Sequence, residues 1–288
     1  MSNLPNLEPH FSALASAYDV FLSDVWGVVH NGEVSFPDAC DALMRVRAMG
    51  KVVILITNAP RPGEAVIRQI DHLHVPHEAY DGIVSSGDVT RDVIAHRKGQ
   101  TICHIGPERD HSIFKDLHVE FAPLESADYI VCSGLFDDEV EKPEDYRARL
   151  EIALKRKLFM VCGNPDLVVE RGSRLIYCAG SIADLYATMG GEVLYAGKPY
   201  RPIYDMALKK AEAALGRKVD MTRVMAIGDS VRTDLKGARA FGIDMLFIAA
   251  GIHAEEFGGR DTPQRDAMKT VFAAAGEAPT AVMKHLTW

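Results

Sequence analysis

The sequence has no long hydrophobic run and no excess of basic residues. None of its apolar stretches approaches the roughly 18 residues that a membrane-spanning helix requires. The first residues, MSNLPNLEPHFSALASAY, lack the basic and apolar regions of a secretory signal, so a cytoplasmic location is expected. A formal charge of −8 argues against broad affinity for nucleic acids or anionic membranes. An anionic ligand would therefore need a local positive group or a metal ion.

The sequence also lacks paired cysteines and several familiar catalytic motifs. Its 5 cysteines form no CxxC pair and most lie in apolar segments, so buried reduced thiols are expected. The histidine-rich segment HLHVPH, residues 72–77, has no acidic or cysteine partners at ligand spacing and predicts a surface turn. The GxSxG elbow of serine hydrolases is absent. In GGEVLYAGKP, Glu192 and Pro199 occupy positions where a nucleotide-binding P-loop needs glycine and serine or threonine.

What the sequence does have is an alternation of short apolar runs and helical patterns. Three runs without internal alternation are typical of strands buried on both faces of a parallel sheet: VFLSD, KVVILITN and VMAIGDS. A helical pattern follows each of them, and this β-α-β-α order predicts a doubly wound α/β fold. Gly50 and Gly242 lie where helix C-caps would fall.

The middle of the chain repeats this alternation with its own elements. Four further apolar runs predict strands, namely TICHIG, ADYIVCSG, LFMVCGNPD and EVLYAGK, and PEDYRARLEIALKRK predicts a helix among them. Because the three earlier runs flank this block, we expect a core domain of residues 1–96 and 193–288 with a second α/β domain, residues 97–192, inserted into it. The last segment, AAAGEAPTAVMKHLTW, is expected to pack on the core.

Polar residues end four of the predicted strands. Ligands of open parallel sheets bind outside the carboxyl ends of the strands. The residues at these ends are Asp24, Thr57, Asn58, Lys198, Asp229, Ser230 and Asp234. Taken singly, each has a structural alternative, because an aspartate can be a helix N-cap, an asparagine a turn former and a lysine a surface residue.

Taken together, these residues indicate a metal-assisted site. Carboxylates crowded at one sheet edge repel one another and need a cation, and oxygen ligands suit Mg²⁺. A lysine and a Thr/Asn pair supply hydrogen-bond donors for phosphate oxygens. The set therefore predicts phosphoryl transfer with an aspartate nucleophile.

In four ordered motifs the sequence resembles the haloacid dehalogenase superfamily, and within it the phosphatases that carry a large α/β cap domain. The motifs are DVWGVVHNG, ITNAP, GKP and GDSVRTD, and the likeness extends to VSFPDACDALMRVRAMG and to the cap segment GNPDLVVERG. The resemblance implies a Rossmann-like core, a cap at residues 97–192, a small phosphorylated metabolite as substrate, and cap-mediated homodimers. That branch includes nitrophenylphosphatase-like, nucleotide, sugar-phosphate and cofactor-phosphate phosphatases.

Carried to this sequence, the resemblance implies roles for individual residues. Asp24 would attack phosphorus and form an aspartyl-phosphate. The Asp24 carboxylate, the Trp26 backbone carbonyl and Asp229 would hold Mg²⁺, with Asp234 supporting them. Phosphate and substrate contacts are implied at Gly27, Thr57, Asn58, Asn164, Asp166 and Lys198. Lys198 would also orient Asp24 and neutralise charge. The NPD turn that begins at Asn164 would reach over the substrate, and its alternative is a simple Asn-Pro turn.

Trp26 departs from the family pattern. Phosphatases of this family usually have a second aspartate here, which protonates the leaving oxygen and then activates water. Tryptophan cannot move a proton, and general acid–base catalysis typically contributes about 10² to 10⁴-fold in rate. Three interpretations stay open: a phosphatase with another proton carrier or an undemanding leaving group, a metal-free 2-haloacid dehalogenase, and a catalytically weakened phosphometabolite-binding protein. His30 is a candidate carrier, and its alternative is a turn histidine.

Overall fold

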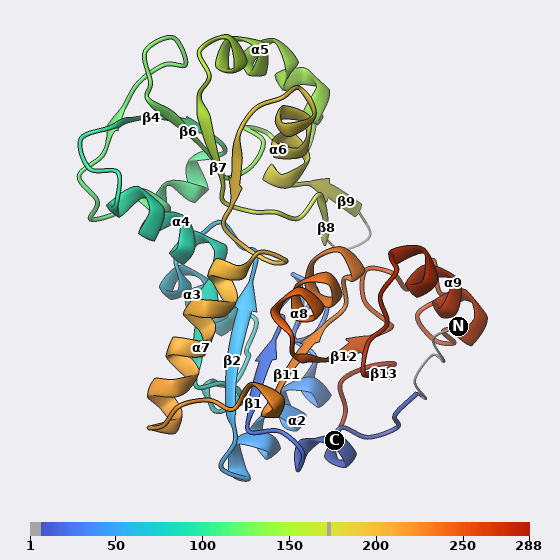
Figure 1. Cartoon of the computed structure of the whole chain (residues 1–288). Helices are drawn as coiled ribbons and strands as arrows, with labels where there is room; N and C mark the ends of the chain where they lie inside the picture. The colour runs from blue at the N-terminus through green and yellow to red at the C-terminus, as the bar shows by residue number, and fades with distance from the viewer. Residues whose placement is uncertain (1–6, 172–173) are drawn as a thin grey trace. The chain divides into compact units, whose positions relative to one another are not determined.

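The computed structural model describes residues 7–171 and 174–288, which divide into two compact units (Figure 1). The first unit contains residues 7–57, Ile67–Val84 and Tyr204–Trp288, and the second contains Asn58–Val66 and Ser85–Ile203. The predicted limits of the inserted domain, residues 97 and 192, fall inside the second unit, and the domain assignment remains a prediction. The first six residues of the start segment and Gly172 of the cap segment lie outside the described residues.

A six-stranded sheet forms the centre of the first unit. Its strand order is β13-β12-β11-β1-β2-β3. The strands are β1 (Val20–Ser23), β2 (Val52–Thr57), β3 (Gly82–Ser85), β11 (Val224–Gly228), β12 (Asp244–Ile248) and β13 (Ala281–Met283). Strand β1 pairs in parallel with β11 on one side and β2 on the other, so that Leu22 lies opposite Ala226 and Ile54. The pairs β11·β12 and β12·β13 are also parallel. The expected parallel sheet is therefore confirmed.

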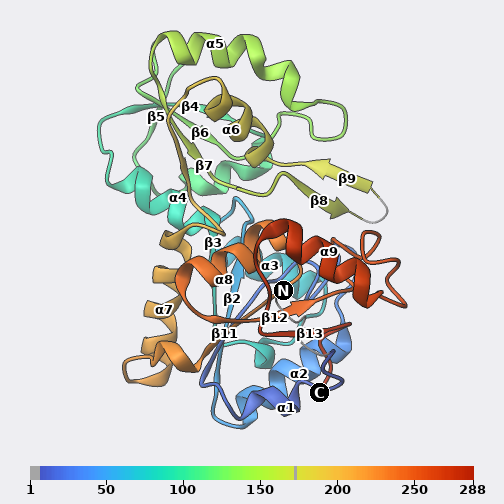
Figure 2. The same ribbon diagram turned by 45° about the vertical axis from the view of Figure 1, so that its right-hand side comes forward.

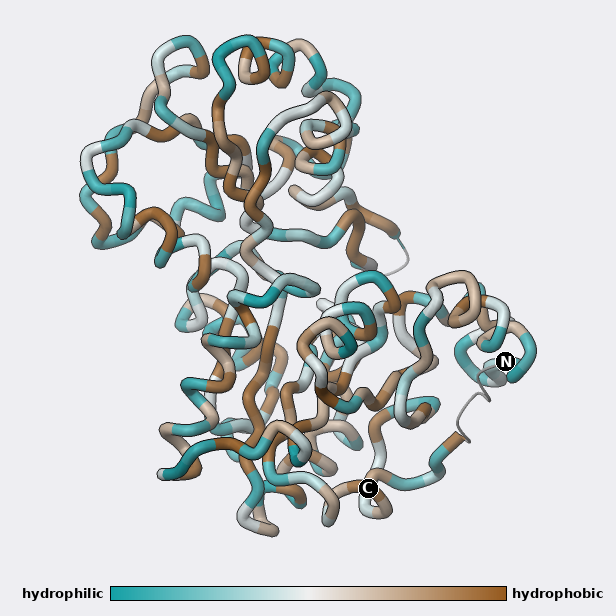
Figure 3. Tube along the Cα trace, viewed as in Figure 1, coloured by the Kyte–Doolittle hydropathy of each residue, from teal (hydrophilic) through white to brown (hydrophobic). Residues whose placement is uncertain are grey.

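The central strands form because their residues suit burial on both faces. Every residue of β1, β2 and β11 is buried, and Figure 3 shows the hydrophobic stretches of the sheet in brown. Helices α2, α7 and α8 flank this sheet in both ribbon views (Figure 1, Figure 2). The helices of this part are α1 (Ser12–Ala15), α2 (Pro37–Ala48), α3 (Gly63–His72), α7 (Arg201–Leu215), α8 (Lys236–Phe241) and α9 (Arg265–Ala275), with short helices η1 (His77–Ala79), η4 (Met221–Arg223) and η5 (Val231–Leu235).

Two glycines end helices as the sequence predicts. Gly242 is the C-cap of α8 and has φ 81°. Gly50 follows Met49, the C-cap of α2, and has φ 74°. A left-handed residue at this position satisfies the last helix carbonyls, and glycine adopts it without a steric penalty.

The sequence analysis did not identify β3, β12 and β13. Strands β3 and β13 contain four and three residues, and β3 runs directly into helix α4 (Ser86–Ala95), so no turn residue separates the two patterns. All three residues of β13 are buried, which confirms that the last segment packs on the core.

The second unit contains a parallel five-stranded sheet and a hairpin. The sheet has the order β10-β7-β6-β4-β5, with β4 (Thr101–Ile105), β5 (Glu120–Phe121), β6 (Tyr129–Cys132), β7 (Phe159–Cys162) and β10 (Val193–Tyr195). The antiparallel hairpin pairs β8 (Val168–Arg171) with β9 (Arg174–Tyr177). The remaining helices are α4, η2 (Glu108–Phe114), η3 (Pro143–Tyr146), α5 (Arg147–Lys155) and α6 (Ala179–Thr188). The four predicted strands and the predicted helix are all present, whereas β5 and the hairpin were not predicted.

The minor sequence predictions also stand. All five cysteines are free, and four of them are buried. His72, His74 and His77 are exposed around the end of α3, as expected of a surface turn. Across the described ranges, no helix combines the length and the hydropathy needed to cross a bilayer.

The strand order identifies where a ligand would bind. From β1 the chain continues through β2 and β3 on one side of the sheet, whereas β11, β12 and β13 lie on the other side. The carboxyl ends of β1 and β11 therefore lie at a topological switch point, where open α/β sheets bind their ligands.

Asp19 joins the amino ends of the three central strands. It precedes β1 and forms ion pairs with Lys51 before β2 (3.1 Å), Arg223 before β11 (2.8 Å) and Arg217 (2.8 Å). The Arg223 hydrogen bond, with the other two cations, holds the pKa of Asp19 well below its usual range. The stabilisation is therefore present at neutral pH and is lost as the pH falls below the ordinary carboxyl pKa of about 4.

Replacing Asp19 by asparagine is expected to lower the free energy of unfolding by about 1–3 kcal/mol at pH 7, because it leaves charged donors without their acceptor. The difference from the parent should shrink at pH 3. Urea denaturation at both pH values measures it. The control is Asp41→Asn, which removes an exposed pair with Arg45 on α2 and should change stability by less than about 1 kcal/mol. Equal effects of the two substitutions would contradict the assignment.

Candidate active site

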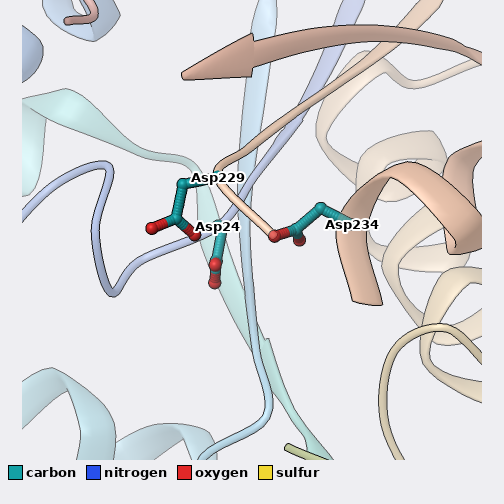
Figure 4. A group of neighbouring side chains, drawn as sticks. All are labelled: Asp24, Asp229 and Asp234. Atoms are coloured by element: carbon teal, nitrogen blue, oxygen red, sulfur yellow. The ribbon is translucent and has the colours of Figure 1, made fainter. Parts of the chain in front are cut away.

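Three carboxylates from the carboxyl ends of neighbouring strands come together in the first unit. Asp24 directly follows β1, Asp229 directly follows β11, and Asp234 lies in η5. One ligand oxygen of each lies within 4.8 Å of the other two, and all three residues are buried. In Figure 4 the carboxyl group of Asp234 points toward the side chains of Asp24 and Asp229. The structure thus brings these predicted residues together, and the binding of metal by them remains a prediction.

The backbone fixes the orientation of Asp24. Its N–H donates to the carbonyl of Ile227 (2.7 Å), which continues the parallel pairing of β1 with β11 beyond the strand end. The N–H of Val25 donates to Asp24 Oδ1 (2.7 Å). One carboxylate oxygen is thereby held by its own loop, and the carboxyl group cannot rotate without breaking this bond.

Backbone donors also hold the other two carboxylates. The N–H of Ile252 donates to Asp229 Oδ2 (2.8 Å), and the N–H of Ser230 donates to Asp234 Oδ2 (3.1 Å). These two hydrogen bonds fix the orientation of both carboxyl groups. Three buried acids this close together repel one another, and a cation is the partner that the sequence predicts for them.

Glycines leave the space in which these carboxylates lie. A Cβ on Gly27, whose φ is 80°, would lie 2.1 Å from Asp229 Oδ2, and one on Gly251 would lie 2.0 Å from the same atom. A Cβ on Gly228 would lie 2.2 Å from Asp234 Cγ. The sequence predicted Gly27 as a phosphate contact. Its position also requires glycine for steric reasons, because any side chain there would displace the Asp229 carboxylate.

The donor set suits a hard divalent cation. All the side-chain donors are carboxylate oxygens, which are ligands that Mg²⁺ and Ca²⁺ prefer, and no sulfur or imidazole ligand belongs to the group. The carbonyl of Trp26, two residues after Asp24, is the further ligand that the sequence predicts, and this role remains a prediction.

Trp26 and His30 pack together in the loop after β1. Their ring centroids lie 5.0 Å apart, and a Cβ on Gly32 would lie 2.5 Å from the Trp26 ring. His30 is buried, and its Nδ1 accepts a hydrogen bond from the N–H of Gly32 (2.9 Å). Burial lowers the pKa of His30 to about 4, so the ring is neutral at pH 7. These contacts favour a structural role for His30 within its turn over a role as proton carrier.

Asn58 ties together two of the predicted motifs inside the second unit. Its Nδ2 donates to Asp166 Oδ1 (3.0 Å) and to the carbonyl of Lys198 (3.1 Å), while its Oδ1 accepts from the N–H of Lys198 (2.7 Å). Since both amide hydrogens are used, the observed role of Asn58 is to position its neighbours. A direct hydrogen bond from Asn58 to phosphate stays a prediction, and it would require one of these two amide hydrogen bonds to break.

The NPD turn and Lys198 complete this group. Asn164 Oδ1 accepts from the N–H of Asp166 (3.1 Å), which closes the turn. Lys198 is only 2% exposed, and burial of an ammonium group requires compensating polar contacts. Lys198 belongs to the second unit and Thr57 to the first, as the buried last residue of β2. Their approach to a phosphoryl group at Asp24 remains a prediction.

The sequence analysis missed the segment after β12. Gly251 and Ile252 supply the space and the hydrogen bond for one Asp229 oxygen. The signal was available in DMLFIAAG, an apolar run that ends in glycine and has the same form as the strands that were identified.

Replacing Asp229 by asparagine is expected to raise the melting temperature in EDTA, because it removes one of three mutually repelling charges. It should also remove the stabilisation that Mg²⁺ gives to the parent, which is about 2.7 kcal/mol when Mg²⁺ is at 100 times its Kd. Thermal unfolding in EDTA and in MgCl₂ measures both effects. The control is Asp266→Asn, whose carboxylate is 96% exposed. A parent protein that Mg²⁺, Mn²⁺ and Ca²⁺ all fail to stabilise would exclude this metal site.

Comparisons with known proteins identify the family of this chain. The family described as haloacid dehalogenase-like hydrolase matches residues 21–120, and the family described as HAD-hydrolase-like matches residues 195–287. A haloacid dehalogenase-like hydrolase from Brucella suis 1330 is 47% identical in sequence, and its crystal structure superposes with a TM-score of 0.87 over 98% of this chain and 100% of that one. The 5'-nucleotidase YutF of Bacillus subtilis is 22% identical over 83% of this chain and 90% of its own length. The acid sugar phosphatase of Staphylococcus aureus is 22% identical over 90% of this chain and 98% of its own. The chain belongs to the haloacid dehalogenase-like hydrolases, in the branch whose members carry an α/β cap domain.

Proposed function

We propose that this protein is a Mg²⁺-dependent phosphatase of a small phosphate monoester, a sugar, nucleotide or cofactor phosphate. The observation that carries the proposal is the meeting of Asp24, Asp229 and Asp234 at the switch point of the sheet. Relatives that are named as a 5'-nucleotidase and an acid sugar phosphatase support the substrate class. A cytoplasmic location and a homodimer remain predictions.

Asp24 is the proposed nucleophile. One carboxylate oxygen bonds to phosphorus as the bond from phosphorus to the ester oxygen breaks, and the leaving group departs with that bond's electrons as an alkoxide or phenoxide, which then takes a proton from water. Water then attacks the aspartyl-phosphate, releases inorganic phosphate and restores the carboxylate.

Other residues would hold the phosphoryl group and the metal ion. Thr57 would donate to a phosphoryl oxygen, and Lys198 would neutralise charge beside Asp24. Mg²⁺ bound by Asp24, Asp229, Asp234 and the Trp26 carbonyl would supply charge stabilisation to the phosphoryl oxygens. Asn58 would act at one remove, because its amide fixes the main chain of Lys198 and the side chain of Asp166.

Trp26 shapes the choice of substrate. The leaving oxygen receives no proton from position 26, and His30 is neutral, buried and bonded within its turn. The missing acid is worth about 3 to 5 kcal/mol of activation free energy for a basic leaving group. The resulting loss of rate is smallest for aryl and acyl phosphates, whose leaving groups are weakly basic anions, and larger for the alkyl esters of sugars and nucleotides.

The two alternatives make different use of the same site. A metal-free dehalogenase has no need of Asp229 and Asp234, whose buried charges would destabilise it without a cation. A phosphometabolite-binding protein has no need of a nucleophile. The absence of an acid at position 26 is the observation in favour of this second alternative. A measurement of turnover decides between a binding protein and a phosphatase.

Asp24→Asn is expected to abolish phosphate release while leaving the fold intact. The amide removes the nucleophile and one metal ligand but keeps the shape of the side chain. Phosphate release from p-nitrophenyl phosphate, with MgCl₂ and with EDTA, measures the activity, and circular dichroism checks the fold. Chloride release from 2-chloropropionate that survives EDTA would establish the dehalogenase instead. Tight phosphate-ester binding by both proteins without turnover would establish the binding protein.

The rate for the parent should fall steeply as the leaving group becomes more basic, since no acid protonates it. A series of substituted phenyl phosphates together with an alkyl phosphate measures this dependence. Trp26→Asp should raise kcat for the alkyl phosphate at least about 10-fold relative to p-nitrophenyl phosphate, by restoring part of the typical 10² to 10⁴-fold contribution. The control is Trp26→Asn, which changes the packing against His30 but carries no acid. A parent rate that is independent of leaving-group basicity would show that a proton carrier exists elsewhere.

A further inference from the structure

Residues 229–234, here called the acidic loop, carry two of the three carboxylates and are bonded to the segment after β12 at two points. The N–H of Ile252 donates to Asp229 Oδ2 (2.8 Å), and the N–H of Val231 donates to the imidazole Nε2 of His253 (3.2 Å). The first bond holds a side chain of the acidic loop, and the second holds its main chain. Two successive residues after β12 therefore support the loop.

The ring of His253 is itself held in place. Its Nδ1 lies 3.0 Å from Glu256 Oε1, and its centroid lies 6.3 Å from the ring of Phe247 and 5.9 Å from that of Phe257. A backbone N–H can only donate, so Nε2 is an acceptor, and Nδ1 carries the proton that it donates to Glu256. The side chain is only 18% exposed. The ring therefore presents its acceptor to the acidic loop in one fixed orientation.

The Val231 hydrogen bond acts on an unusual helical turn. Val231 is the first residue of η5, a π-helix of five residues. Such turns are rare and occur frequently at functional sites, and the first N–H groups of a helix have no acceptor within it. His253 supplies the acceptor for Val231. Because Asp229 lies before η5 and Asp234 lies within it, the conformation of this turn sets the distance between the two carboxylates.

We propose that His253 positions the carboxylates of the acidic loop for metal binding. It would act through the main chain of Val231 and would contact neither the metal ion nor the substrate. The inference rests on the proposed function, in which these carboxylates bind Mg²⁺. Removal of a group that orients metal ligands typically lowers metal affinity or activity by about 10- to 100-fold. Without His253, the Val231 N–H loses its acceptor and the turn between the two carboxylates is free to relax.

Three substitutions separate the hydrogen bond from the packing of the ring. His253→Phe keeps an aromatic ring beside Phe247 and Phe257 but has no acceptor. His253→Gln loses the ring and keeps an amide oxygen that reaches the Nε2 position, whereas the amide of His253→Asn is one methylene group too short. Calorimetric titration with MgCl₂ measures the Kd of each variant. We expect His253→Phe and His253→Asn to raise the Kd about 10- to 100-fold, and His253→Gln to recover most of that loss.

His77→Phe is the matched control. His77 is another histidine of the first unit that pairs with a carboxylate, that of Asp71 (2.7 Å), and it is 67% exposed. This variant should bind Mg²⁺ as the parent does. Thermal unfolding of each variant in EDTA checks that it folds, and the Asn and Gln variants decide the question if His253→Phe does not.

Phosphate release from p-nitrophenyl phosphate, measured over a range of MgCl₂ concentrations, is a second readout. In His253→Phe the rate should fall at low Mg²⁺ and return toward that of the parent at saturating Mg²⁺, because the nucleophile Asp24 is unchanged. A loss of kcat that persists at saturating Mg²⁺, with an unchanged Kd for Mg²⁺, would make His253 a proton carrier and overturn the positioning role.

The outcomes also distinguish this inference from the proposed function. Equal Mg²⁺ affinity in His253→Phe, His253→Asn and the parent would overturn the inference while the phosphatase stands. A loss in His253→Gln as large as in His253→Phe would assign the ring to packing and would overturn it as well. A parent that binds Mg²⁺ but releases phosphate from no ester would overturn the phosphatase alone, and the titrations would still decide the role of His253. A parent that binds no Mg²⁺ would overturn both.

Discussion

The repulsion among three buried carboxylates is the constraint on which the rest of the first unit depends. Asp24, Asp229 and Asp234 are brought within 4.8 Å by the parallel pairing of β1 with β11, and the hydrophobic burial of those strands stabilises the arrangement against the repulsion. Nearby backbone N–H groups and glycines give the carboxylates donors and space. If a cation binds between them, as proposed, its binding free energy adds to the stability of the folded protein.

Much of the sheet and of the carboxylate cluster could be predicted from the sequence, because the patterns that indicate them lie within a few neighbouring residues. Buried parallel strands give unbroken apolar runs, as in VVILIT. The polar residue that ends each run lies at the carboxyl edge of the sheet, because parallel strands all end at that edge. Gly50 and Gly242 follow from helix-end geometry. Strands β3 and β13 could not be identified with equal ease, because four or three residues carry no periodicity and their strand character depends on pairing with neighbours.

Contacts between residues far apart in the chain could not be predicted from the sequence. Nothing in ITNAP shows that the Asn58 amide is consumed by Asp166 and Lys198, since that depends on where more than 100 residues of intervening chain return. The same holds for Gly251 beside Asp229.

Trp26 is built into its loop, and this bears on how the chemistry evolved. The ring lies against His30 and over Gly32, where any larger residue would strike it. An aspartate at position 26 would leave that space empty and the histidine without its aromatic neighbour, so the loop is adapted to tryptophan. The carbonyl at position 26, the proposed metal ligand, belongs to the backbone and does not depend on the side chain. Under the proposed function the groups that bind and attack a phosphoryl group are present, and the side chain that would protonate the leaving group is absent. Selection among substrates would then depend on the acidity of the leaving group, because the ester itself must supply what a general acid supplies elsewhere.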